Sequence, residues 1–300
     1  MTPHASAPGG TPSRVVLRVK DDDLTGSRGE DRLGATLAEA RETAEEVTLI
    51  VSGPVLPEGL ADAVALARNA GFVRVGLRTV AAGLGRRESV DSLVAAGLSD
   101  ACMWLWGAEP RVHEHHTDRS GSFAETVSTL SALRSAGVST AAATPLTRSN
   151  HRLLFELPPL LASRGVSAWC VVVPRAVDPS SPVPGRVMPR LALALPFALH
   201  ALSMAHAAGV PAWVAGAPLC LLGPFAQHAL PTTMRSYGTP CASCASRPTC
   251  PGVDGGYLRR FGGDELRPRP AAGRPWGSAS LGRLFVDIDG TAGAPWEPAS

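Results

Sequence analysis

Short apolar runs alternate with longer amphipathic stretches through most of the chain. The short runs are rich in β-branched residues and are bounded by glycine, proline and polar residues, which is typical of buried strands. Seven strands are predicted, at 14–19, 46–52, 73–79, 101–106, 139–145, 168–174 and 211–216. The longer stretches carry charges at helical spacing and predict five helices, at 59–70, 88–96, 122–136, 150–163 and 190–208.

Five glycines follow these helices closely. A glycine after the last helical residue favours a left-handed cap, because it has no Cβ to clash with the backbone. The predicted caps are Gly71, Gly97, Gly137, Gly165 and Gly209. Repeated strand–helix units predict an α/β fold with a parallel sheet covered by helices. Periodicity alone leaves two arrangements open, a doubly wound sheet and a barrel.

Composition and charge exclude several classes of partner. The 300 residues carry a formal net charge of +2 without a block of basic residues, so neither nucleic acid nor a membrane surface is expected as a partner. The first residues are polar and rich in Pro and Gly, and we interpret them as a disordered leader, not a secretory signal. The longest apolar runs are interrupted by Pro, His and Gly, which disfavours a membrane span. We expect a cytoplasmic protein whose thiols are reduced.

The six cysteines fall into two groups. Cys241, Cys244 and Cys250 have the spacing Cys-x2-Cys-x5-Cys in a proline-rich loop, and this pattern favours metal ligation over core packing. A tetrahedral metal site or a cubane iron–sulfur cluster needs a fourth ligand, for which Cys220 is the nearest candidate. The remaining two cysteines lie inside predicted strands, where the residue usually packs as a small hydrophobe. They are Cys102 and Cys170.

The segment "PLC" followed by "CASCASRPTCPGVDGGYLRRFGGDELRP" resembles the C-terminal extension of radical S-adenosylmethionine (radical SAM) proteins. It is similar to their auxiliary-cluster modules, described as SPASM-like or Twitch-like. Upstream, "TLIVSGPVLPEGL", "HEHHTDRSGSF" and "TPLTRSN", which ends at Asn150, resemble the strand and loop segments of the same family. The resemblance covers residues 14 to about 270 and implies a partial (β/α)6 TIM-like barrel with a small Cys-rich extension. The domains it implies are a leader at 1–13, the barrel at 14–218, an iron–sulfur-binding extension at 219–270 and a Pro/Gly-rich tail at 271–300.

The chain departs from the family pattern at the cosubstrate site. Family members carry Cys-x3-Cys-x2-Cys after the first strand, whereas the matching segment here, "KDDDLTGSRGEDRL" at 20–33, has no cysteine. Of the elements that contact S-adenosylmethionine, the resemblance leaves only Ser52, Gly53 and Thr79. These losses argue against binding of S-adenosylmethionine. No catalytic residue is predicted.

Three weaker motifs have ordinary structural interpretations. Asp21, Asp22 and Asp23 are oxygen ligands suited to Mg²⁺ or Ca²⁺, but a solvated turn with an aspartate capping a helix is expected. "HEHH" at 113–116 is interpreted as a solvated polar loop and "DIDG" at 287–290 as the turn after a terminal strand.

Three functions follow from the resemblance and its departures. The first is a radical SAM-like pseudoenzyme that holds one auxiliary [4Fe–4S] cluster with Cys220, Cys241, Cys244 and Cys250. It would serve as partner, scaffold or electron-transfer component, with an intact radical SAM enzyme or a precursor peptide as partner, in the modification of a peptide or small molecule. The second is an active radical SAM enzyme with unorthodox cluster ligation. The third is a non-catalytic binding module in which zinc stabilises the four-cysteine fold.

Overall fold

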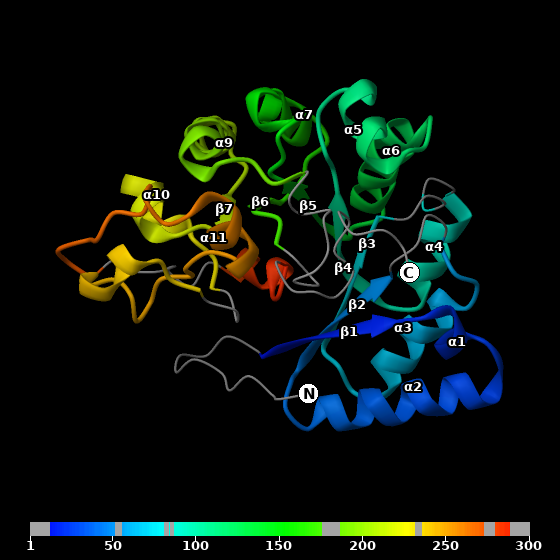
Figure 1. Ribbon diagram of the computed structural model, residues 1–300. Coiled ribbons are helices and arrows are strands. Elements are labelled where there is room, and N and C mark those ends of the chain that lie inside the picture. The colour runs from blue at the N-terminus through cyan, green and yellow to red at the C-terminus, as the bar shows by residue number, and fades with distance from the viewer. Residues whose placement is uncertain are drawn as a thin grey trace. The chain divides into compact units, whose positions relative to one another are not determined.

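Seven β-strands follow one another in chain order in one sheet (Figure 1). The computed structural model describes residues 13–51, 56–80, 84, 87–175, 187–231, 236–272 and 280–288. The strands are β1 (Arg14–Val19), β2 (Glu46–Val51), β3 (Arg74–Thr79), β4 (Leu98–Trp104), β5 (Ser139–Pro145), β6 (Ala168–Val172) and β7 (Ala212–Ala215). The pairs β1–β2, β2–β3, β3–β4 and β6–β7 are parallel. The predicted α/β, TIM-like architecture and all seven strands are confirmed.

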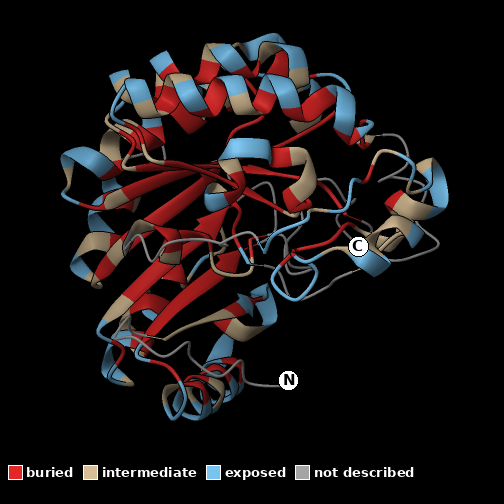
Figure 2. Ribbon diagram, turned by 90° about the vertical axis from the view of Figure 1, so that its left-hand side faces the viewer, coloured by how far each residue is buried: buried red, intermediate tan, exposed pale blue. Residues whose placement is uncertain are grey.

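Helices connect the strands, as the alternating pattern predicted. They are α1 (Asp21–Leu24), α2 (Gly26–Arg41), α3 (Leu60–Asn69), α4 (Arg87–Ala95), α5 (Pro110–Thr117), α6 (Ser122–Ser135), α7 (Leu157–Ser163), α9 (Leu191–Ala207), α10 (Leu219–Leu222) and α11 (Gly255–Phe261). Four 3₁₀ helices are also described: η1 (His151–Glu156), η2 (Gly223–His228), η3 (Thr239–Ser243) and η4 (Ser280–Phe285). Figure 2 shows strands buried along their length and helices buried on one side and exposed on the other. Among the helices that the structure describes, none has the length and apolarity needed to cross a bilayer.

The five predicted glycine caps are confirmed. Gly71, Gly97, Gly137, Gly165 and Gly209 all have left-handed backbone angles, with φ between 63° and 101°. An L-residue with a side chain pays a steric penalty in this region, so glycine ends each helix at low cost and turns the chain toward the next strand.

The chain divides into two compact units. The first consists of Met1–Met103 and Ala124–Ala141, and the second of Trp104–Phe123 and Ala142–Ser300. The four cysteines predicted as ligands all belong to the second unit.

A buried charge network crosses the first unit at the start of its strands. Arg14 donates to both carboxylate oxygens of Asp100 at 2.7 and 2.8 Å, and its Nε donates to Glu46 at 2.8 Å. Arg74 lies 3.5 Å from Asp100 and adds a second cation to the network. Gly76 leaves room for the Arg14–Asp100 ion pair, because a Cβ at this position would lie 2.3 Å from Asp100 Oδ1. Burial alone would lower the pKa of Arg14, but Asp100 and Glu46 raise it above its ordinary value.

Two loop predictions and one strand prediction are wrong. The segment 20–33 forms α1 and the first half of α2, where the side chain of Asp23 accepts the Lys20 N–H as a cap. Residues 113–116 lie in α5, whose first residue is Pro110, and a proline at that position is pre-shaped for a helix. Residues 283–286, which precede the "DIDG" motif and were predicted as a terminal strand, lie in η4 and the turn after it. The turn predicted for the motif is present at 287–288. The other half of the "DIDG" motif and all but the last residue of the predicted leader at 1–13 lie outside the described residues.

Candidate functional site

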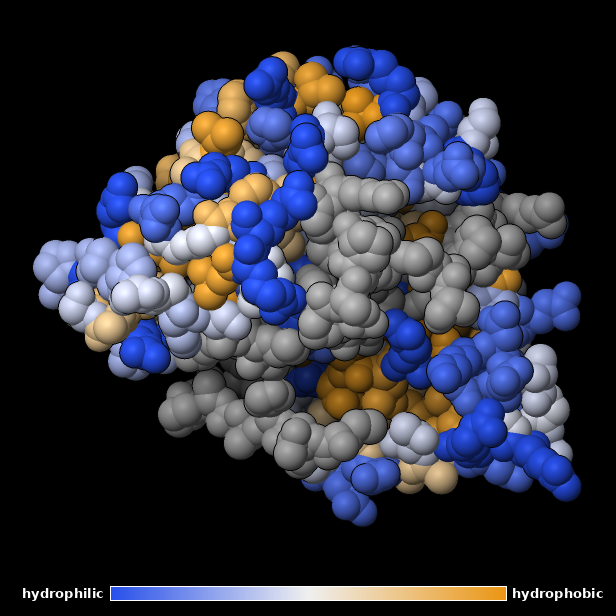
Figure 3. Space-filling model, viewed as in Figure 1, coloured by the Kyte–Doolittle hydropathy of each residue, from blue (hydrophilic) through white to orange (hydrophobic). Residues whose placement is uncertain are grey.

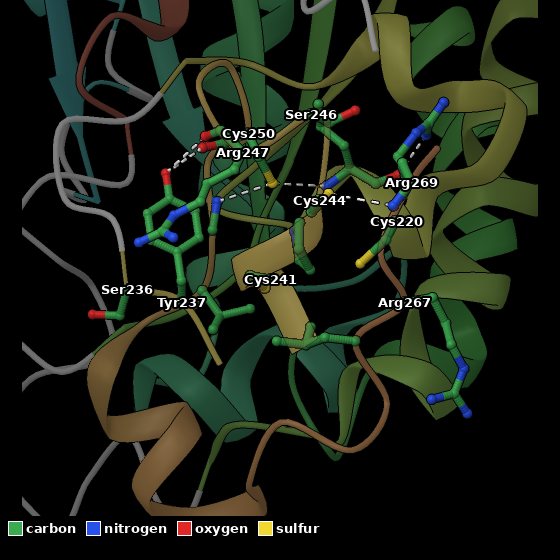
Figure 4. A pocket seen from close by; sticks show the side chains of 15 residues that line it. Cys220, Ser236, Tyr237, Cys241, Cys244, Ser246, Arg247, Cys250, Arg267 and Arg269 are labelled. Atoms are coloured by element: carbon green, nitrogen blue, oxygen red, sulfur yellow. Dashed lines mark hydrogen bonds between the residues drawn. The ribbon is translucent and has the colours of Figure 1, made fainter. Parts of the chain in front are cut away.

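The structure brings the four predicted cysteine ligands to one pocket in the second unit (Figure 4). Cys220 lies on α10, just after β7, and Cys241 lies on η3. Cys244 directly follows η3, and Cys250 ends the turn after it. The empty space between the lining residues, including its opening to solvent, is about 350 Å³. Within the described residues, no three His, Cys, Asp or Glu side chains form a group arranged to hold a metal ion. Ligation by these cysteines therefore stays a prediction.

Backbone geometry fixes the cysteine loop at both ends. Ser236 and Val253 form an isolated antiparallel bridge, with both N–H···O bonds between 3.0 and 3.1 Å. Gly252 has φ of +69°, and a Cβ there would lie 2.6 Å from the Ser236 carbonyl oxygen. Pro240 in the first turn of η3 favours that turn, because its φ is already set for it. These backbone features position Cys241, Cys244 and Cys250, although the loop that carries them has no hydrophobic core of its own.

Backbone N–H groups point at two of the sulfur atoms. Leu219 N and Gly252 N donate to Cys250 Sγ at 3.4 and 3.3 Å, and Arg269 N donates to Cys244 Sγ at 3.3 Å. A thiol sulfur is a weak acceptor, whereas a thiolate accepts strongly. Donors aimed at sulfur therefore favour the deprotonated form, which is the form that binds metal.

Two of the four cysteines, Cys220 and Cys241, have raised thiol pKa values, so they favour the protonated form when no metal is bound. Burial raises the pKa of Cys220, and the nearby sulfurs of Cys250 and Cys241 raise it further. Burial likewise raises the pKa of Cys241, again with a contribution from its cysteine neighbours. Backbone hydrogen bonds from Arg267 and Gly238 partly oppose these shifts. A metal centre would displace these protons and relieve the repulsion between neighbouring thiolates.

Two tyrosines tie the cysteine loop to its surroundings. Tyr237 Oη donates to the carbonyl oxygens of Arg247 and Cys250 at 3.2 and 3.1 Å. The buried Tyr257 hydroxyl donates to Glu265 and accepts the backbone N–H of Leu191 at 2.8 Å. The second tyrosine therefore connects the residues after the loop to the first turn of α9.

The other two cysteines lie where the sequence predicted them. Cys102 in β4 is 3 % exposed and Cys170 in β6 is fully buried. Burial, opposed by Arg78 and reinforced by Asp100, raises the pKa of Cys102 to about 12. Both side chains serve as small core residues, as predicted.

The segment 20–33, which the resemblance matches to the radical-cluster loop of radical SAM proteins, does not fit an iron–sulfur cluster. Residues 20–33 contain no thiol, and Asp23 is committed to Arg32, whose Nη2 lies 2.7 Å from Asp23 Oδ1. Gly29 packs so closely on the preceding turn that a Cβ would lie 2.5 Å from the Asp22 carbonyl oxygen. Of the residues predicted to face the cosubstrate, Thr79 is buried in β3, and Ser52 and Gly53 lie outside the described residues.

A polar cluster that the sequence prediction missed lies after β4 and β5 in the second unit. The His116 ring stacks on Trp106 with centroids 4.2 Å apart, and its Nε2 lies 2.8 Å from Ser149 Oγ. His113 Nδ1 accepts the Trp106 backbone N–H at 3.3 Å. Asn150 is buried and donates to the carbonyl oxygens of Trp106 and Pro145, each at 2.8 Å. The helical spacing of the histidines after Pro110 was the available signal.

These histidines predict a pH dependence of stability. Burial, with smaller contributions from nearby cationic groups, lowers the pKa of both His113 and His116 from 6.5 to about 4. The unfolded chain then takes up protons before the folded one, so the free energy of unfolding should decrease as the pH falls from 6.5 to about 4. Urea unfolding at stepped pH would measure it. His116→Gln should flatten this dependence, while His200→Gln, on the exposed face of α9, should leave it as in the wild type. Equal slopes in both variants would contradict the assignment.

Comparison with known proteins places the fold. No protein-family model and no curated protein matches the chain. Among solved structures, SuiB from Streptococcus suis matches with a TM-score of 0.51 and 10 % identity, over 68 % of this chain and 49 % of SuiB. SuiB bound to S-adenosylmethionine and SuiB bound to the precursor peptide SuiA each match with a TM-score of 0.50 and 10 % identity, over 68 % of this chain and 47 % and 49 % of SuiB.

These likenesses support a radical SAM-like fold. At 10 % identity they show the fold alone, and the matched part spans about half the length of SuiB. The class is therefore defined by architecture, and the function has to be argued from the residues of this chain.

Proposed function

We propose that this chain is a radical SAM-like protein that binds one [4Fe–4S] cluster and does not itself cleave S-adenosylmethionine. The ligands are Cys220, Cys241, Cys244 and Cys250, and the cluster lies in the extension, 219–270, that follows a barrel at 14–218. The observation that carries the proposal is the convergence of four cysteines on one pocket, with backbone N–H groups directed at two of the sulfurs.

The composition of the pocket supports iron–sulfur chemistry over a purely structural loop. Four thiols match the Cys₄ ligand set of a cubane cluster. Hydrogen bonds to ligand sulfurs are among the features by which proteins tune such clusters. The loop has little apolar content of its own, so metal binding would contribute to its order. When bound, a cluster with four protein ligands exchanges single electrons and has no open iron for a cosubstrate.

The first unit supports a non-catalytic assignment. Cleavage of S-adenosylmethionine in this family depends on a cluster with one open iron, held by three thiolates after the first strand. Here that segment is helical, lacks cysteine and uses Asp23 in an ion pair with Arg32. The barrel therefore acts as scaffold, partner or electron-transfer component of an intact enzyme. SuiB has been solved with a precursor peptide, which supports a peptide as the molecule being modified.

A turnover assay tests the pseudoenzyme assignment. Anaerobically purified and reconstituted protein, given dithionite and S-adenosylmethionine, should form no 5′-deoxyadenosine above a protein-free blank. An intact radical SAM enzyme in the same buffer serves as the positive control. Sustained formation of 5′-deoxyadenosine that is lost in Cys244→Ala would overturn the assignment, and would show that this chain recruits a catalytic cluster through ligands outside the usual loop.

A further inference from the structure

The cysteine-rich segment carries an excess of positive charge. Residues 236–272 contain five arginines and three acidic residues, so their net charge equals the +2 of the whole chain. Four of the five arginines are exposed: Arg247, Arg259, Arg260 and Arg267. In Figure 3, strongly hydrophilic residues lie among paler ones over this part of the chain, at the left of the view.

The arginines flank the cysteine pocket. Arg247, Arg267 and Arg269 all line it, with Arg247 on one side of the cysteines and the other two on the opposite side (Figure 4). Arg267 donates to the carbonyl oxygen of Asp264 at 2.7 Å, and Arg269 donates to that of Leu219 at 3.0 Å. The Arg247 guanidinium lies 5.0 Å from the centroid of the Tyr237 ring. Their partners are carbonyl groups and a ring, so none of the three charges is neutralised by a carboxylate of the described residues.

The acidic residues of the segment are mostly engaged elsewhere. Asp254 caps α11 by accepting the Tyr257 N–H at 3.1 Å, and Glu265 accepts the Tyr257 hydroxyl. Both are half-buried, which leaves Asp264 as the one exposed carboxylate between 236 and 272. The surface around the pocket is therefore positive on both sides of the cysteines.

We propose that this arginine rim, defined as Arg247, Arg267 and Arg269, is the docking surface for a small acidic electron-transfer protein. The inference rests on the proposed function, because the partner exchanges electrons with the cluster held by the four cysteines. Arginine suits this contact, since its planar guanidinium pairs with carboxylates in a fixed geometry. Complementary charge would steer the encounter and raise the association rate at low ionic strength.

The exposure of the ligands favours a redox protein over a peptide substrate. Cys220, Cys241 and Cys244 are half-buried and Cys250 is buried, so the cluster would approach the surface inside the rim. Four cysteine ligands leave no iron free to bind a substrate group. One electron would pass from the reduced partner protein to the cluster. This transfer makes and breaks no bond and requires no proton transfer.

The rate of cluster reduction tests this surface. The donor is flavodoxin in its fully reduced form, an acidic flavoprotein, and reduced methyl viologen, a small cation, is the reference donor. The double variant Arg247→Glu/Arg267→Glu should slow reduction by flavodoxin about tenfold or more at low salt, and should make the rate nearly independent of salt. Reduction by the viologen should not slow, because the new charges attract a cation. The control Arg152→Glu/Arg164→Glu alters two exposed arginines, one in η1 and one at the end of α7. It has the same change in charge and should behave as the wild type.

Iron and sulfide content separates the possible failures. Arg247→Lys/Arg267→Lys keeps the charge and should retain most of the flavodoxin rate, which guards against a loss caused by misfolding. A wild-type chain without a cluster overturns the proposed function and the docking surface with it. A cluster-loaded chain that flavodoxin reduces at the same rate in the wild type and the charge-reversed variant overturns the docking surface alone. Acidic peptide binding that is lost in the charge-reversed variant while flavodoxin reduction is unchanged would assign the rim to a peptide instead.

Discussion

Arg14→Met should lower the free energy of unfolding of this protein by about 3–5 kcal/mol. The Arg14 side chain is 1 % exposed and forms ion pairs with two buried carboxylates, those of Glu46 and Asp100. Methionine has a similar length but no charge, so both buried carboxylates would lose the guanidinium that pairs with them. Equilibrium unfolding in urea, followed by circular dichroism at neutral pH, measures the change.

An exposed ion pair in the same unit provides the control. Arg32 also pairs with an aspartate, but its side chain is 58 % exposed, and such pairs contribute about 0.2–1 kcal/mol. Arg32→Met should therefore change the stability far less than Arg14→Met. If both variants lost a similar free energy of unfolding, the buried network would contribute no more to stability than an exposed ion pair, which would contradict the prediction.

Cys244→Ala should abolish assembly of a stable cluster. Loss of one thiolate leaves an incomplete ligand set and an N–H of Arg269 without its sulfur acceptor. Iron and acid-labile sulfide should fall to background after reconstitution, and residues 236–272 should become sensitive to limited proteolysis. The β-strands and helices before 211 should keep their far-ultraviolet circular dichroism.

Cys170→Ala is the matched control, because it removes a thiol that is buried in β6. This variant should retain the full iron and sulfide content at a modest cost in stability.

Cys220→Ala tests the assignment of the fourth ligand, since Cys220 lies some twenty residues before the other three. A Cys220→Ala protein with a complete and equally stable cluster would point to another fourth ligand.

Local sequence signals predicted the alternating frame of the fold. Strands such as β2 and β6 are buried throughout and therefore appear as continuous apolar runs. Glycines such as Gly97 and Gly137 mark helix ends because the left-handed conformation is costly for other residues. The four cysteines could be grouped for a similar reason, since three are close in sequence and the fourth follows β7 directly.

Features that depend on distant residues could not be predicted in the same way. Arg14 and Asp100 are 86 positions apart, and only the parallel strand order brings them together. The segment 20–33 was interpreted as a loop because it matches the position of the family's cluster loop, whereas packing of Leu33 and Leu37 into the core stabilises α2. Residues 113–116 were interpreted as solvated because histidine is polar, but stacking on Trp106 withdraws His116 from water.

Iron and acid-labile sulfide analysis of the anaerobically purified wild-type protein, combined with Mössbauer spectroscopy, tests the central claim most directly. The proposed function predicts about four iron atoms and about four sulfides per chain, with the spectrum of a single cubane cluster. About one zinc ion per chain without acid-labile sulfide would contradict it, and would identify the four cysteines as a structural zinc site.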